Sequence, residues 1–126
     1  MDVLASRVLL RPVDFDRSYA FYARTLGLHV FREFAGGAVF FLGGGYLELS
    51  GQGGPPATGD KVSLWLQVRD VDAEWDRLGA AGADQVEAPV DKAWGLREAR
   101  IRDPDGLLLV LVQVPEGHPL RRDRRG

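Results

Sequence analysis

The chain has 126 residues, of which 45% are hydrophobic and 27% are charged, a composition typical of one globular domain with its own core. The net charge of -2 argues against a general nucleic-acid binder, and no apolar run approaches the roughly 18 residues of a membrane helix. The absence of cysteine excludes a disulfide framework and a thiolate metal site. The first residues lack the pattern of a signal peptide, so we expect a cytoplasmic protein.

The first half of the chain predicts one strand, one helix and three further strands. Residues 7–13 alternate as a strand, and Asp14 or Asp16 can cap the helix that follows. Gly27 ends that helix as a C′ residue. The apolar stripe of the helix consists of Phe15, Tyr19, Tyr22 and Leu26. Glycine-rich turns separate the next three strands, which we place at residues 28–34, 38–42 and 46–50.

The second half repeats this order after a segment rich in glycine and proline at residues 51–60. A strand at residues 62–68 precedes a helix that Asp70 or Asp72 can cap. The stripe of this helix consists of Val71, Trp75 and Leu78. A short strand at 85–90 follows, and then a hairpin of residues 98–102 and 107–114 around the turn Asp103-Pro104-Asp105-Gly106.

An offset of 56 residues superimposes the two halves, since it places Leu10 on Leu66, Asp14 on Asp70 and Tyr19 on Trp75. Later the offset grows to 62, which places Leu47 on Leu109. We therefore predict two βαβββ units within a single domain, 1–126. Its parts are a first repeat at about 6–51, a linker at 51–60, a second repeat at about 61–114 and a basic tail at 115–126. We expect the tail, with its four arginines, to be solvated and disordered.

Three motifs carry a resemblance to a known family. They are Val13 to Tyr22 with Leu26-Gly27-Leu28, Val68 to Asp72, and Trp94-Gly95 with Arg97-Glu98 and Arg102 to Gly106. In their order and spacing the chain resembles the vicinal oxygen chelate superfamily of glyoxalase I, extradiol dioxygenases and bleomycin-resistance proteins, over residues 6–114. The resemblance implies an α+β fold. Each βαβββ module would be a half-barrel of mixed sheet, with a helix outside and a ligand cavity inside.

Strand alternation predicts which side chains face that cavity, because the helix of each module covers the opposite face of its sheet. The expected residues of the first module are Arg7, Leu9, Arg11, Tyr46, Glu48 and Ser50. Those of the second module are Ser63, Trp65, Gln67, Leu108, Val110 and Val112. Two further aromatic residues, Phe40 and Trp94, can add to the walls, so the cavity suits a planar ligand.

The resemblance also implies four metal-ligand positions in the metal-dependent members, and these fall on Arg7, Glu48, Ser63 and Val110. Only Glu48 is a ligand of the usual kind, because arginine has no lone pair to donate and valine has no donor atom. The two histidines, His29 and His118, lie outside the motif. We therefore expect no metal and no cofactor, which argues against glyoxalase and dioxygenase chemistry.

The leading hypothesis is a metal-free binding protein of the bleomycin-resistance type that sequesters a planar or aromatic small molecule, as in antibiotic self-resistance. Such proteins are homodimers, so the resemblance implies a second copy as partner. The alternatives are a metal-free enzyme with Glu48 as general base and Arg7 or Arg11 stabilising an oxyanion, an enzyme with a non-standard metal site, and a regulatory subunit. In the plainest interpretation Trp65 and Tyr46 fill the core, and Glu48 only neutralises Arg7.

Overall fold

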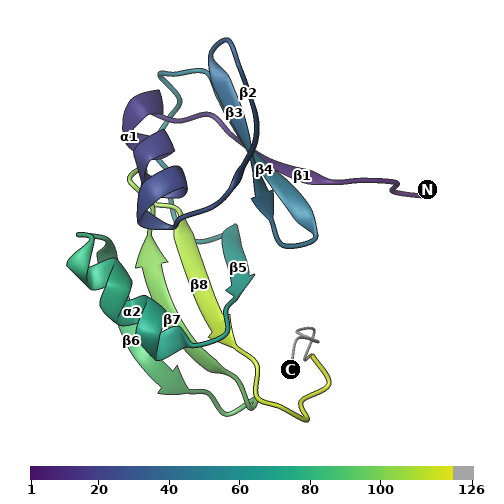
Figure 1. Cartoon of the computed structure of the whole chain (residues 1–126), viewed down its shortest axis with the longest axis vertical. Coiled ribbons are helices and arrows are strands. Elements are labelled where there is room, and N and C mark those ends of the chain that lie inside the picture. Colours follow the sequence, from purple (N-terminus) through teal and green to yellow (C-terminus); the bar gives the residue numbers. More distant parts are fainter. Residues whose placement is uncertain (121–126) are drawn as a thin grey trace. The chain divides into compact units, whose positions relative to one another are not determined.

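The computed structural model describes residues 1–120 and shows an α+β chain with two four-stranded mixed sheets (Figure 1). The chain divides into two compact units. The first unit is Met1–Gly59 together with Asp103–Leu107, and the second is Asp60–Arg102 together with the described residues from 108 to 120. The four arginines of the basic tail lie outside the described residues. In the described part, no helix is long and apolar enough to cross a membrane.

The first unit follows the expected order of strand, helix and three strands. Its elements are β1 (Arg7–Leu10), α1 (Phe15–Ala20), a π-helical turn η1 (Phe21–Thr25), β2 (Val30–Phe34), β3 (Gly37–Leu42) and β4 (Gly45–Ser50). The strand order is β1-β4-β3-β2, with β1 parallel to β4 and the other pairs antiparallel. The first strand ends before the predicted residue 13, and β2 begins at Val30 rather than at residue 28.

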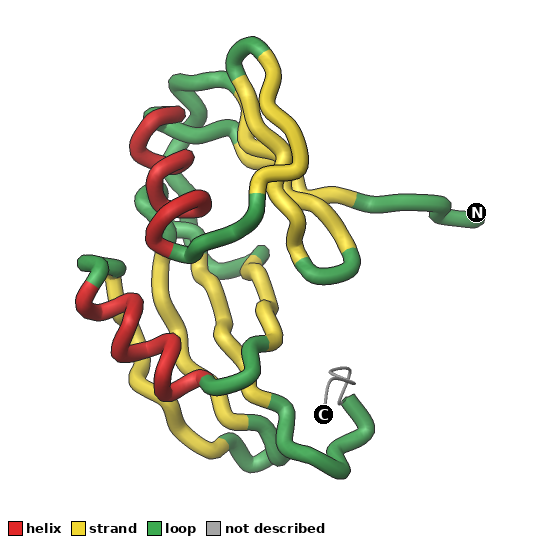
Figure 2. Tube along the Cα trace, viewed as in Figure 1, coloured by secondary structure: helices red, strands yellow, loops and turns green. Residues whose placement is uncertain are grey.

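The second unit has the same architecture. Its elements are β5 (Ser63–Gln67), α2 (Val71–Ala80), β6 (Asp84–Asp91), β7 (Arg97–Arg102) and β8 (Leu108–Gln113). The strand order is β5-β8-β7-β6, and β5 again runs parallel to β8. The paired βαβββ modules predicted from the sequence are therefore confirmed, each with its helix beside one sheet (Figure 2).

The internal repeat extends to the register of the strands. Arg7 lies opposite Tyr46 in the first sheet, and Ser63 lies opposite Leu108 in the second. These pairs are related by the same offsets of 56 and 62 residues that align the two halves of the sequence. Of the alternative caps, Asp14 and Asp70 are the residues used, since their carboxylates accept from the amides of Arg17 and Ala73 at 3.3 and 3.0 Å.

Each helix covers one face of its own sheet, and alternate strand residues fill the layer between them. In the first unit these are Ala38, Phe40, Leu47 and Leu49, packed with Tyr22 of η1. In the second they are Leu64, Ile101, Leu109 and Leu111, packed with Val71 and Leu78 of α2. Of the apolar stripes predicted for the two helices, Tyr22, Val71 and Leu78 are buried. The other members are only partly buried: Phe15, Tyr19, Leu26 and Trp75.

The first helix departs from the predicted α-helical stripe at its end. The amide of Leu26 donates to the carbonyl of Phe21 at 2.8 Å, which is the i→i+5 pattern of a π-turn. Gly27 then ends the helix at φ 76°, as expected for a C′ glycine. The wider turn places Phe21 and Tyr22 side by side in the core, with their rings perpendicular and 5.0 Å apart.

The turn between β7 and β8 belongs to the first unit, although both strands belong to the second. Asp103 is buried within it and accepts 2.9 Å hydrogen bonds from the amides of Asp105 and Leu107. Its second carboxylate oxygen accepts from the Tyr22 hydroxyl at 2.6 Å. Burial and the adjacent Asp103 carboxylate raise the pKa of Tyr22, so this phenol stays neutral and donates. The Asp105 carboxylate accepts from the Val13 amide at 3.1 Å.

Tyr22→Phe removes the only side-chain donor to that oxygen of Asp103 among the hydrogen bonds of the described chain. The buried carboxylate then loses a charge-assisted bond, and we expect the free energy of unfolding to fall by about 1.5–3 kcal/mol. Urea denaturation measures this loss. The control is Tyr19→Phe, whose partly exposed hydroxyl donates to Glu33 and whose loss water can replace. Equal effects of the two variants would contradict the structural role of the Tyr22 bond.

We expect low pH to reduce the folding stability of the second unit, because the carboxylate of Asp72 at the start of α2 becomes protonated. Hydrogen bonds of 2.9 Å from Arg97 hold the pKa of this carboxyl below its usual range. A carboxyl with a lowered folded-state pKa contributes stability above its unfolded pKa of roughly 3.9, and this contribution disappears as the pH falls through the folded value. Asp72→Asn should therefore lose less stability than the parent between pH 7 and pH 3. Denaturation midpoints at both pH values test this, with Asp76→Asn on the same helix as the control.

Candidate functional site

The face of the first sheet that points away from α1 gathers most of the predicted cavity residues of the first module. Arg7, Tyr46 and Phe41 lie opposite one another on β1, β4 and β3. Leu9 and Glu48 form the next row in the same direction. Since side chains alternate along a strand, all five project from one side of the sheet. We call this side the open face of the first unit.

Phe40 is not part of the open face, and its predicted place in a cavity wall is wrong. Its side chain has 0% exposure, and its ring lies 5.6 Å from that of Tyr19 and 6.3 Å from that of Tyr22. The physical reason is strand alternation: Phe40 pairs with Leu47, a helix-facing core residue. Its neighbour Phe41 points to the opposite side.

Three aromatic rings form a cluster on the open face: Phe31, Phe41 and Tyr46. The ring of Phe31 stacks on Tyr46 at 5.1 Å and lies 5.0 Å from Phe41. Phe31 and Phe41 remain 48% and 44% exposed, so the cluster presents ring surface to solvent. Sequence reasoning missed both phenylalanines. The alternation that placed Tyr46 could have located Phe41, but a bulge in β2 next to Phe31 removes the simple parity there.

Arg7 and Glu48 form an ion pair beside this aromatic cluster. Arg7 Nη1 donates to Glu48 Oε1 at 2.7 Å, and the guanidinium carbon lies 5.7 Å from the centre of the Tyr46 ring. The carboxylate side chain is 22% exposed. The arrangement agrees with the structural interpretation of Glu48 as the partner that neutralises Arg7. The pair fixes the polar edge of the aromatic cluster.

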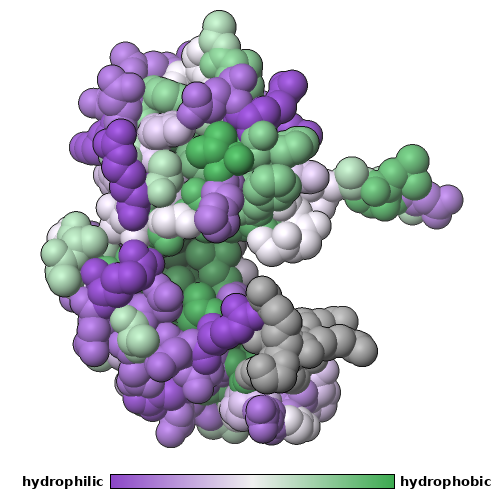
Figure 3. Space-filling view, in the orientation of Figure 1, coloured by the Kyte–Doolittle hydropathy of each residue, from purple (hydrophilic) through white to green (hydrophobic). Residues whose placement is uncertain are grey.

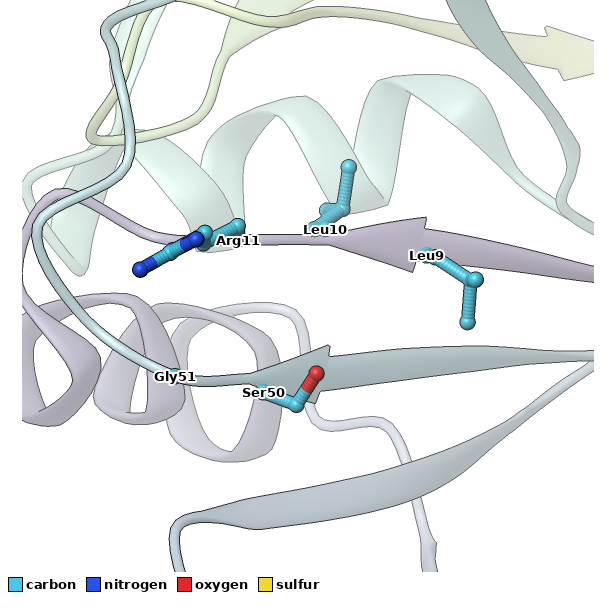
Figure 4. A pocket seen from close by; sticks show the side chains of 5 residues that line it. All are labelled: Leu9, Leu10, Arg11, Ser50 and Gly51. Atoms are coloured by element: carbon cyan, nitrogen blue, oxygen red, sulfur yellow. The ribbon is translucent and has the colours of Figure 1, made fainter.

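A pocket of about 300 Å³ opens where β1 and β4 end (Figure 4). It is lined by Leu9, Leu10, Arg11, Ser50 and Gly51. Figure 4 shows the side chains of Leu9 and Ser50 between the two strands, with the Arg11 side chain at the rim. Arg11 Nε donates a long, 3.4 Å hydrogen bond to the carbonyl of Gln52, and within residues 1–120 its other guanidinium donors have no hydrogen-bond partner.

The second unit has its own open face, on the side of its sheet opposite α2. Trp65, Val110 and Arg100 form one row across β5, β8 and β7. The neighbouring rows bring Ser63 to Leu108 and Gln67 to Val112. Trp65 is 49% exposed, whereas Val110 is buried in a cluster with Leu96, Val112, Val114 and Leu108.

Trp94 lies in the loop before β7 with 58% of its surface exposed. Its indole Nε1 donates to Glu98 Oε2 at 2.7 Å. Glu98 itself is only 4% exposed. The sequence analysis placed it in a family motif but did not include it among the residues expected to face the cavity. The ammonium of Lys92 lies 6.0 Å from the Trp94 ring and pairs with Glu87 at 2.6 Å.

The four positions that would hold a metal in metal-dependent relatives do not fit one. Glu48 is engaged by Arg7, and Val110 is buried among aliphatic side chains. Across residues 1–120, no three His, Cys, Asp or Glu side chains gather where they could hold an ion. His118 accepts a hydrogen bond from the Leu120 amide through Nδ1.

The family model of the Glyoxalase/Bleomycin resistance protein/Dioxygenase superfamily matches residues 5–111. Together with the paired βαβββ modules, this match shows that the chain belongs to that superfamily. A comparison with curated proteins gave no match.

Solved structures show the same fold. TioX from Micromonospora sp. ML1 is 30% identical, with a TM-score of 0.71, over 88% of this chain and 98% of that one. A glyoxalase/bleomycin resistance protein/dioxygenase from Nocardioides is 20% identical, with a TM-score of 0.76, over 98% of this chain and 91% of the other. A glyoxalase-related enzyme from Fulvimarina pelagi is 21% identical, with a TM-score of 0.73, over 91% of this chain and 90% of the other.

Substitution of each of the two adjacent phenylalanines of β3 tests which one belongs to the core and which one to the open face. Phe40→Ala should lower the free energy of unfolding by about 3–5 kcal/mol, because it leaves a cavity under α1. Phe41→Ala should lower it by about 1 kcal/mol or less, because this ring is already half exposed. Urea denaturation of both variants measures the difference. A larger loss for Phe41→Ala would reverse the assignment of the two faces.

Proposed function

We propose that this protein is a non-enzymatic, metal-free binding protein of the bleomycin-resistance type, which sequesters a planar or aromatic small molecule. The observation that carries the proposal is the exposed aromatic cluster of Phe31, Phe41 and Tyr46 on the open face of the first unit. Exposed stacked rings on a rigid sheet offer flat contact area at little conformational cost. Trp65 and Trp94 offer similar surfaces in the second unit.

The charged groups near these rings support binding rather than catalysis. Glu48 is the one carboxylate predicted as a general base, and it holds a 2.7 Å bond to Arg7. A base must reach the proton that it abstracts, and this carboxylate is already oriented toward a cation in its own sheet. Arg11, by contrast, has donors available at a pocket rim and suits a polar substituent of the ligand. Sequestration of an aromatic antibiotic would make the protein a self-resistance factor.

The proposal includes a homodimer, with a second copy of the chain as partner. The N-terminal arm before β1 supports this part. Val3 and Leu4 are 70% and 95% exposed, and Figure 3 shows the arm as a hydrophobic extension. Apolar side chains on an extended arm gain stability when another surface covers them. Size-exclusion chromatography with light scattering tests the oligomeric state, and a monomer at micromolar concentration would contradict this part of the proposal.

A thermal-shift screen with aromatic antibiotics tests the ligand class. A ligand present at about 100 times its Kd should stabilise the protein by about 2.7 kcal/mol, which raises the Tm by several degrees. Phe41→Ala should weaken the affinity of any hit by about tenfold, since a stacked aromatic pair contributes roughly 0.5–1.5 kcal/mol beyond its buried area. The control Val86→Ala truncates an exposed apolar residue of β6 and should leave the affinity unchanged. Turnover of a small polar substrate, with no aromatic hit, would favour the enzymatic alternative based on Glu48.

A further inference from the structure

Arg100 of β7 carries a buried donor atom on the open face of the second unit that the proposed function does not use. It lies in the row with Val110 and Trp65, on the open face of the second unit. Its side chain is 35% exposed, yet its Nε is buried and has no hydrogen-bond partner among the described residues. A buried donor on a charged group is costly when it is unpaired, and native structures leave few of them. This donor is therefore a place where a bound acceptor would gain free energy.

The surroundings of Arg100 define what kind of acceptor fits. Glu98 Oε1 lies 3.9 Å from Arg100 Nη2, which is too long for a hydrogen bond but close enough to balance the guanidinium charge. The other oxygen of Glu98 is held by the Trp94 indole at 2.7 Å. Lys92 is likewise balanced by Glu87. Because both cations already face a carboxylate, an additional negative charge would meet repulsion from Glu98.

We infer that Arg100 Nε donates a hydrogen bond to an uncharged carbonyl oxygen of the ligand, such as that of an aromatic amide. Glu98 sets the preference for a neutral acceptor over a carboxylate. The exposed rings of Trp65, in the same row as Arg100, and Trp94, bonded to Glu98, provide the flat surface beside the carbonyl. This inference rests on the proposed function and names a specificity-determining pair within it. It assigns to Arg100 and Glu98 roles that strand alternation alone does not suggest.

The first test compares three probes that share one ring system: 2-naphthamide, 2-naphthoate and 2-methylnaphthalene. NMR titration of the full chain gives a Kd for each. We expect 2-naphthamide to bind most tightly. Arg100→Lys keeps the positive charge beside Glu98 but removes the Nε donor, and it should weaken 2-naphthamide at least about tenfold while 2-methylnaphthalene is unchanged. The matched control Arg77→Lys alters an exposed arginine that pairs with Glu74 on α2, and it should change none of the three.

The second test changes the selectivity rather than the affinity. Glu98→Gln keeps an oxygen that can accept from the Trp94 indole but removes the charge that balances Arg100. We expect 2-naphthoate to overtake 2-naphthamide in this variant by about tenfold. Far-UV circular dichroism and the Tm confirm that each variant is folded.

The outcomes separate the two proposals. If no probe and no aromatic antibiotic binds, the proposed function itself fails. If the aromatic probes bind but Arg100→Lys leaves 2-naphthamide unchanged, the proposed function stands and the role of Arg100 is overturned. If the parent protein prefers 2-naphthoate, or if Glu98→Gln does not shift the preference, the role of Glu98 as the selector of neutral acceptors is overturned.

Discussion

The coverage of one sheet face by one helix is the constraint on which the rest of each unit depends. Once α1 or α2 buries one side of its sheet, the two-residue period of a strand fixes which side chains point the other way. That is why a single residue step separates Phe40, sealed against Tyr19 and Tyr22, from Phe41, half exposed beside Tyr46. The same step separates Ala99, fully buried, from Arg100, whose Nε is left without a partner in the described chain.

Much of this arrangement could be predicted from the sequence, because alternation, helix caps and an internal repeat are local patterns. Asp14 and Asp70 as caps, the repeated register and the shared face of Arg7, Leu9, Tyr46 and Glu48 all follow from them. What could not be predicted depends on contacts between distant residues. The indole of Trp94 reaches Glu98 only because of the loop conformation before β7. Phe40 was misplaced because the alternation that located Tyr46 was not applied to the strand at 38–42, where Phe40 pairs with the core residue Leu47.

The two open faces share a chemical design. Each has exposed aromatic rings beside an arginine and a glutamate: Arg7 with Glu48 in the first unit, and Arg100 with Glu98 in the second. The pairs differ in one respect that matters for recognition. The first pair is closed by a 2.7 Å bond, whereas the second is 3.9 Å apart and leaves Arg100 Nε without a partner among residues 1–120. The first therefore stiffens its aromatic cluster, and the second can discriminate between ligand substituents.

The turn at Asp103 makes the first repeat depend on residues from the second repeat. Two βαβββ repeats suggest halves that once folded independently, and a cut in the linker at 51–60 would separate them in the sequence. Such a cut would leave the first half without residues 103–107, whose carboxylates satisfy the Tyr22 hydroxyl and the Val13 amide. An amino-terminal fragment would therefore retain its strand and helix patterns while losing the partners of its buried polar groups. The first unit therefore depends on residues 103–107, which belong to the second repeat in the sequence.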